Sequence, residues 1–200
     1  MTADVLDALP ARRGHFLLES GYHTDLWLTL DGMFVDTRAL APLVSALAGR
    51  LRPHAPTAVC GPLLGGAFVA QAVATVLGAA FYFTEPVPAP ADPGLFRARY
   101  RLPPALHGRA VGERMAVVDD VISAGSSVRA TAEALTAIGA SVVAVGALLV
   151  LGDAAEAHFA AQGIPVEAVG RSGFSLWAPD ECPLCHAGTP LEDPRVADEG

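Results

Sequence analysis

Apolar and polar positions along the chain fall into short apolar runs that alternate with longer segments of helical spacing. Apolar runs of this length predict strands, and the segments of helical spacing predict the helices between them. The predicted strands cover residues 58–60, 80–83, 115–118, 141–151 and 166–169. The predicted helices cover residues 39–51, 66–77, 127–138 and 154–162, and Asp36 or Thr37 can cap the first of them. This alternation favours an α/β fold with a parallel sheet flanked by helices, which binds ligands beyond the carboxyl ends of its strands.

The segment with the clearest chemistry follows the predicted strand 115–118. Two adjacent carboxylates, Asp119 and Asp120, are followed by a loop of small residues, 123–127, that opens an alanine-rich helix. Loop amides at a helix N-terminus can bind a phosphate, Gly125 lets the backbone approach it, and serine hydroxyls add hydrogen bonds. Carboxylates can accept hydrogen bonds from ribose hydroxyls or help to place Mg²⁺. The segment therefore predicts a ribose 5-phosphate site, whereas the simpler alternative is a polar turn with surface acids.

Composition limits the classes of partner. The chain has 200 residues, 52% of them hydrophobic, and a mean hydropathy of +0.41, which indicates one domain with a sizeable core. No apolar run reaches the ~18 residues that span a bilayer, so we expect a soluble, cytoplasmic protein without a membrane partner. The net charge is −8 and all 13 cationic side chains are arginines, which argues against nucleic acid. Without lysine the chain also lacks a Gly-x-x-x-x-Gly-Lys-Ser/Thr phosphate loop.

The segment around Asp119 and Asp120 resembles the phosphoribosyl pyrophosphate (PRPP) signature of type I phosphoribosyltransferases in its orotate form. Residues 14–21, Gly-His-Phe-Leu-Leu-Glu-Ser-Gly, resemble the N-terminal hood strand of that family, and residues 61–66, Gly-Pro-Leu-Leu-Gly-Gly, resemble its pyrophosphate loop. Residues 182–191 resemble the end of one bacterial branch of these enzymes. The resemblance implies one phosphoribosyltransferase domain, with a hood in residues 1–35, a core in 36–176 and a tail in 177–200.

The resemblance further implies a Mg²⁺-dependent enzyme that joins orotate to PRPP, forms orotidine 5′-phosphate and releases pyrophosphate, and that works as a homodimer. It assigns catalysis to Asp119, Asp120, Arg97 and Arg99. It assigns PRPP binding to Asp119, Asp120, Val121, Ile122, Ser123, Ala124, Gly125, Ser126, Ser127, Leu63, Leu64, Gly65, Gly66 and Arg101. Pro62 is the candidate for the cis peptide that this loop often holds in the family.

Two departures from the family pattern leave the activity open. The mobile loop that carries a catalytic lysine in the family offers only Arg97, Arg99 and Arg101 here, and arginine keeps its charge but is a poor proton donor. Arginines at alternating positions also describe the solvated face of an ordinary strand. The base pocket, bounded by Glu19, Trp27 and Leu151 on this resemblance, should reject anionic orotate in favour of a neutral ring. An orotate enzyme, an enzyme for another base, and an inactive PRPP- or nucleotide-binding regulator all stay open.

The three cysteines do not make a disulfide framework. Cys182 and Cys185 form a single Cys-x-x-Cys, and His186 could be a third metal ligand. Structural zinc sites normally have four ligands, so we expect a free cysteine pair rather than zinc at Cys182, Cys185 and His186. Cys60, at the end of a predicted strand, is expected in the core.

Overall fold

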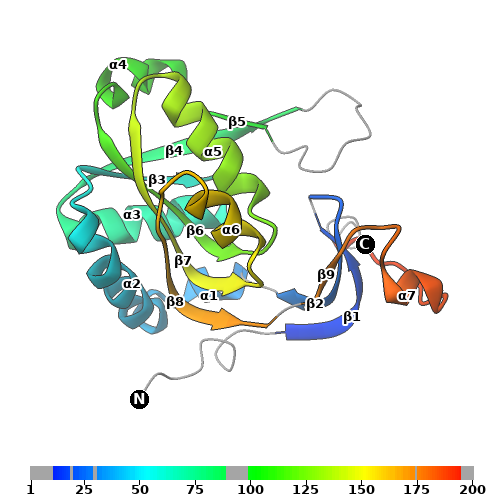
Figure 1. The fold of residues 1–200 in the computed structure, drawn as a ribbon. Coiled ribbons are helices and arrows are strands. Elements are labelled where there is room, and N and C mark those ends of the chain that lie inside the picture. Colours follow the sequence, from blue (N-terminus) through cyan, green and yellow to red (C-terminus); the bar gives the residue numbers. More distant parts are fainter. Residues whose placement is uncertain (1–10, 19, 29–30, 89–98, 174, 195–200) are drawn as a thin grey trace.

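Two β-sheets organise the protein in a computed structural model that describes residues 11–18, 20–28, 31–88, 99–173 and 175–194 (Figure 1). The larger sheet has six strands in the order β5-β4-β3-β6-β7-β8, and the smaller has three in the order β1-β2-β9. The strands of the larger sheet are β3 (Ala58–Pro62), β4 (Ala80–Val87), β5 (Arg99–Arg101), β6 (Arg114–Ile122), β7 (Ser141–Leu151) and β8 (Val166–Ser172). All are parallel except β5, which runs antiparallel to β4 at the edge.

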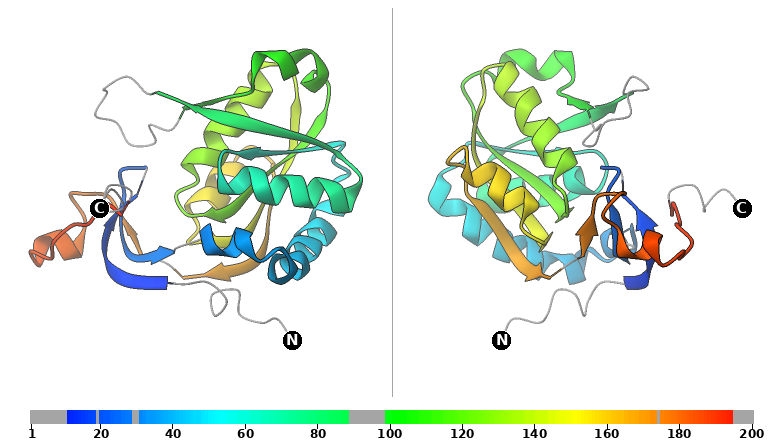
Figure 2. Two further views of the ribbon diagram at one scale, coloured as in Figure 1. Left: turned by 180° about the vertical axis from the view of Figure 1, so that it is seen from behind. Right: turned by 45° about the vertical axis from the view of Figure 1, so that its right-hand side comes forward.

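Helices cover both faces of the larger sheet (Figure 2). The helices along the described chain are α1 (Asp31–Val35), α2 (Thr37–Leu51), α3 (Gly65–Leu77), α4 (His107–Ala110), α5 (Ser126–Ala137), α6 (Ala154–Ala160) and α7 (Pro183–His186). The last of them belongs to the tail and lies beside the smaller sheet (Figure 1). The expected capping of α2 is confirmed, because the Asp36 side chain accepts hydrogen bonds from the amides of Arg38 and Ala39 at 3.0 and 3.2 Å.

The core lies on both sides of β6 because successive strand side chains point to opposite faces. Met115 and Val117 are buried with residues of α5 and α6, while Ala116 and Val118 are buried with residues of α2 and α3. A strand covered on both faces is a continuous apolar run, which is the pattern that the sequence shows here. The predicted α/β class, with a parallel sheet flanked by helices, is confirmed.

The smaller sheet joins the two ends of the chain. β1 (Ala11–Leu17) pairs antiparallel with β2 (His23–Leu28), and β2 pairs with β9 (Leu176–Trp177). Beyond α7 the chain returns to β1, where Glu192 exchanges backbone hydrogen bonds with His15 and Leu17 at 2.8 and 2.9 Å. Strands β1 and β2 and the described part of the tail therefore form one structural unit beside the larger sheet (Figures 1 and 2). No helix in the described ranges is long and apolar enough to cross a membrane.

Candidate active site

The two acids lie near the carboxyl end of the central strand β6. We expected this strand to end at Val118, before the acids, and that boundary is wrong. The strand continues to Ile122 because the neighbouring strand β7 offers it pairing partners as far as Val150. The ladder holds the backbone of both acids rigid, with Asp119 paired to Ala147.

Asp119 is buried, with 5% of its surface exposed. Its Oδ1 accepts a hydrogen bond from the amide of Asp120 at 3.1 Å, and its Oδ2 accepts one from the hydroxyl of Ser127 at 2.7 Å. Burial, together with the neighbouring charge of Asp120, raises the pKa of Asp119 well above its ordinary value, although the Ser127 hydrogen bond acts in the opposite direction. Buried acids with shifted pKa values gather at functional sites, and Asp119 has the surroundings of one.

The loop after β6 has the geometry of an anion site. Gly125, the residue before α5, has a φ of +82°, which a side chain would make unfavourable, and a Cβ there would lie 2.9 Å from the Cβ of Ala155. The Oγ of Ser126 is buried but has no hydrogen-bond partner among the described residues. A buried hydroxyl without a partner is costly unless a ligand satisfies it. The loop therefore offers both amides and an unsatisfied hydroxyl to a bound anion.

A second glycine-rich loop approaches the acids from the end of β3. A Cβ added to Gly65 would overlap the carboxylate of Asp120, and one added to Gly66 would overlap the carboxylate of Asp119. Only glycine allows the two segments to lie this close. The loop holds a cis peptide between Leu63 and Leu64, not at Pro62 as expected, since Pro62 is still paired with Thr84 of β4 as part of the strand.

These segments enclose one pocket of about 320 Å³. Its walls come from the end of β6 and the loop after it, the end of β3 and the loop after it, the hood and β5. They consist of Leu18, Ser20, Trp27, Pro62, Leu63, Leu64, Gly65, Gly66, Tyr100, Asp119, Asp120, Val121, Ile122, Ser123, Gly125, Ser126 and Ser127. No arginine, lysine or histidine is among these described wall residues. Most of the predicted site residues therefore meet in one cavity whose charge comes from two acids.

Several predicted site residues lie elsewhere. Ala124 is buried beneath the loop, and Leu151 is buried in a small apolar cluster with Leu149 outside the pocket. Arg99 and Arg101 are exposed on β5, with Arg101 paired to Glu85 at 3.4 Å. Glu19 and Arg97 fall outside the described residues.

Sequence reasoning assigned no binding role to four of the wall residues, Leu18, Ser20, Pro62 and Tyr100. Tyr100 alternates with the two arginines of β5, so a strand period of two places it on the opposite face, and that signal was present in the sequence. Leu18 and Ser20 belong to the hood motif, but no local pattern shows that the hood reaches the carboxyl end of β6.

Comparison with known proteins gives one consistent result. The chain is 34% identical over 185 residues to the orotate phosphoribosyltransferase of Heliobacterium modesticaldum, a match that covers 90% of this chain and 88% of the relative. It is 31% identical over 197 residues to the same enzyme of Thermotoga petrophila, with 97% of each chain covered. The crystal structure of orotate phosphoribosyltransferase from Aeropyrum pernix superposes with a TM-score of 0.62 and 24% identity, over 80% of this chain and 87% of that one. No protein-family model matches the chain.

Proposed function

This chain belongs to the orotate phosphoribosyltransferase family, as its motifs predicted, and we propose that its pocket transfers the phosphoribosyl group of PRPP to orotate. The products are orotidine 5′-phosphate and pyrophosphate. The observation that carries the proposal is the close approach of the β3–α3 loop to the acids of β6, because one cavity then offers sites for both ends of PRPP.

The β6–α5 loop binds the 5-phosphate of PRPP. The amides at the start of α5 point toward a bound anion, and the buried hydroxyl of Ser126 gains the partner that it lacks among the described residues. Asp120, which lines the pocket, accepts hydrogen bonds from the ribose hydroxyls. Asp119 accepts hydrogen bonds from the Asp120 amide and the Ser127 hydroxyl, so it holds the loop in register with the strand and keeps further acceptor sites on the pocket wall for the sugar.

The β3–α3 loop binds the departing pyrophosphate through the amides of residues 63–66. The sugar becomes cationic as the bond to pyrophosphate breaks, and amide donors aimed at the leaving group stabilise the charge that develops there. Members of the family use a divalent metal ion, and carboxylate oxygens of the kind found here are ligands that Mg²⁺ prefers. Asp120, with the ribose hydroxyls and the pyrophosphate, would hold Mg²⁺, which supplies charge neutralisation on the leaving group when bound.

The hood forms the base side of the pocket. Trp27 offers an aromatic face for stacking, and Leu18 and Ser20 complete this wall. The lack of a basic side chain among the described wall residues favours a second candidate, a phosphoribosyltransferase for a less anionic base, because an anionic ring gains affinity from a cationic partner.

A single assay separates the two candidates. Pyrophosphate release from PRPP and Mg²⁺ is measured with orotate, uracil, hypoxanthine, adenine and nicotinate, each at the same concentration. The proposal expects the highest kcat/KM with orotate. Preference for a neutral base identifies the second candidate, and PRPP binding without release in any arm contradicts both.

The proposal includes a homodimer. An apolar groove of about 500 Å³ lies between α1, α2 and α3 and is lined by Phe34, Leu40, Val44, Phe68 and Val76, with Phe68 45% exposed. A second copy of the chain would cover this face. Analytical ultracentrifugation should show a dimer that Phe68→Glu dissociates, whereas Val111→Glu, at an exposed apolar residue outside the groove, should leave it intact. A monomeric wild-type protein contradicts the dimer.

The proposal also places the enzyme in the cytoplasm. None of the three cysteines forms a disulfide, which is the usual state in a reducing compartment.

A further inference from the structure

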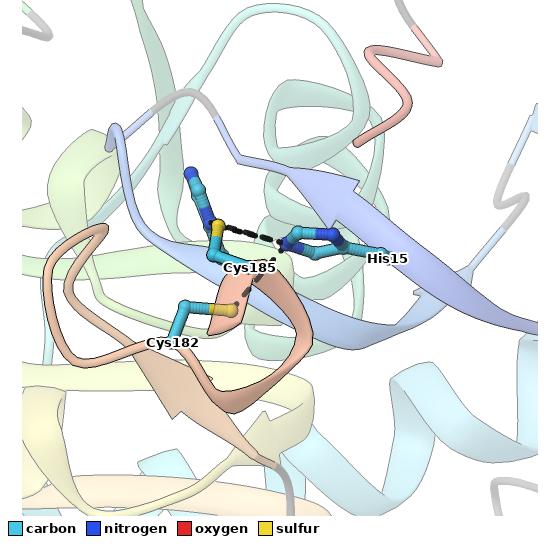
Figure 3. A group of neighbouring side chains, drawn as sticks. His15, Cys182 and Cys185 are labelled. Atoms are coloured by element: carbon cyan, nitrogen blue, oxygen red, sulfur yellow. Dashed lines mark hydrogen bonds between the residues drawn. The ribbon is translucent and has the colours of Figure 1, made fainter. Parts of the chain in front are cut away.

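Four side chains that the proposed reaction does not use converge where the tail meets the hood. They are His15 of β1, His23 of β2, Cys182 just before α7 and Cys185 within α7. One nitrogen or sulfur atom from each lies within 4.8 Å of the others. His15, His23 and Cys182 are buried, and Cys185 is on the outer side. Figure 3 shows both cysteines directed toward the ring of His15.

The spacing of these atoms matches a tetrahedral metal site. The Nε2 of His15 lies 3.2 Å from the Nδ1 of His23, 3.4 Å from the Sγ of Cys182 and 3.7 Å from the Sγ of Cys185. The Sγ of Cys185 lies 3.3 Å from the Nδ1 of His23. Zinc bonds of about 2.0–2.1 Å to nitrogen and about 2.3 Å to sulfur place tetrahedral ligands about 3.3–3.8 Å apart. The four separations of 3.2–3.7 Å lie close to this range and leave room for one zinc ion at the centre.

The orientation of His15 supports a metal rather than a hydrogen-bonded cluster. Its Nδ1 lies 2.9 Å from the carbonyl oxygen of Thr189, which can only accept, so Nδ1 carries the proton and Nε2 presents a lone pair. A single lone pair accepts one hydrogen bond well, yet the His23 ring and both cysteine sulfurs lie close to the Nε2 of His15. A metal cation between the two histidines and the two cysteines would bind all four ligand atoms. The carbonyl of Thr189 then fixes the orientation of the His15 ring, as hydrogen-bond partners of metal-bound histidines commonly do.

We propose that His15, His23, Cys182 and Cys185 bind a structural zinc ion that fastens the C-terminal tail to the hood. Two thiolates and two imidazoles in a tetrahedron select zinc, and a site with four protein ligands keeps no open position for a substrate. The sequence favoured a free cysteine pair and offered only His186 as a possible third ligand, but His186 is not in the cluster. The two histidines that complete the set lie in the hood, 167 residues from Cys182 in the case of His15.

The position of the ion gives it a role in the fold. β1 and β2 lead into the hood residues that line the pocket, and the tail reaches them through β9 and the backbone of Glu192. A zinc ion would hold these strands and the turn at Cys182 as one unit. Metal that binds only the folded chain stabilises it, so removal should loosen the hood and tail.

The test is the metal content of the full-length chain, expressed without a histidine tag in zinc-supplemented medium and purified without chelator. Mass spectrometry of metals should find about one zinc per chain. Cys182→Ser and Cys185→Ser should each weaken zinc affinity by more than about tenfold, measured by competition with a chelator, since even changes behind the ligands cost that much affinity. His186→Ala is the matched control, because it alters a neighbouring histidine outside the cluster and should keep the metal.

A second measurement does not depend on the variants folding. Cobalt(II) in place of zinc should give the strong visible absorption of a tetrahedral sulfur and nitrogen site in the wild-type protein, and chelation should lower the melting temperature. Wild-type protein with only trace zinc and no such absorption overturns the proposal, as does zinc that is retained when both cysteines are changed to serine. Zinc binding in a protein that does not turn over PRPP would contradict the proposed function and leave the metal site standing.

Discussion

Asp119 and Asp120 are neighbours in the chain but occupy different surroundings. Asp119 is buried and accepts hydrogen bonds from its own loop, whereas Asp120 lies half-buried on the pocket wall. Two carboxylates this close disfavour each other's charge, and burial adds to that cost at Asp119. Holding both charges in the folded chain without a ligand therefore costs stability.

This cost makes stability depend on pH. The raised pKa of Asp119 means that the folded chain holds a proton that the unfolded chain has already lost, from the ordinary value of 3.8 up to the raised value. Stability therefore falls as pH rises through that window. Asp119→Asn should lessen the decline in melting temperature between about pH 4 and pH 8, measured by thermal unfolding without ligand.

The control for this measurement is Asp180→Asn, which changes an exposed acid of the tail. It should leave the pH dependence of the wild type in place. If the melting temperature of Asp119→Asn varied with pH just as that of the wild type does, Asp119 would not be the source of the pH dependence.

Gly65 tests the contact between the two loops. A methyl group at this position would overlap the carboxylate of Asp120, so Gly65→Ala should displace one loop from the other and lower turnover by at least about tenfold, equivalent to about 1.4 kcal/mol. Gly49→Ala is the matched control, because a Cβ at Gly49 in α2 meets nothing within 4 Å. Gly125 is a poorer probe, since its positive φ would strain the fold as well as the site. Normal turnover by Gly65→Ala would contradict the shared pocket.

Strands and helices of the core are predictable because their signals are local. β7 spans the residues that its apolar run predicts, Ser141–Leu151, and α2 begins after a recognisable cap. β9 and α7 could not be predicted from local patterns in the sequence. β9 is a strand of two residues whose pairing with β2 is set by tertiary contact rather than by any pattern of its own.

The edge strand β5 carries Arg99 and Arg101, two of the three arginines that the family resemblance assigns to the mobile loop. Its two arginines face solvent while Tyr100 faces the pocket, so the arginines reach a ligand only if this edge moves toward it. Replacing Arg99 and Arg101 with Ala, together with Arg97, should lower kcat much more than PRPP affinity, because contacts made only in the transition state have that effect.

Arg38→Ala, at an exposed residue of α2, is the control for charge alone. Steady-state kinetics and calorimetric titration of PRPP give the two quantities. If kcat and PRPP affinity fell equally in the triple variant, these arginines would contribute to ground-state binding. If neither kcat nor PRPP affinity fell, they would belong to the solvated face of a strand.

The fold of the whole molecule brings together residues that lie far apart in the sequence. The two loops of the pocket were predictable because each is a continuous motif next to a predicted strand. The remaining wall was not, because Leu18, Ser20 and Tyr100 reach the pocket from the segment after β1 and from β5, and Leu151 lies in an apolar cluster instead. For the same reason His15 and His23 gave no sign in the sequence that they meet the cysteines of the tail.

The most direct test of the account is formation of orotidine 5′-phosphate by the purified wild-type chain from orotate, PRPP and Mg²⁺, identified by mass spectrometry. The account expects this product with the wild type. It expects Asp120→Asn to weaken PRPP binding by about 1.5–3 kcal/mol, the range for a hydrogen bond to a charged group, and to slow product formation without unfolding the chain. A folded wild-type protein that binds PRPP but forms no orotidine 5′-phosphate, or an Asp120→Asn variant with unchanged PRPP affinity, would contradict it.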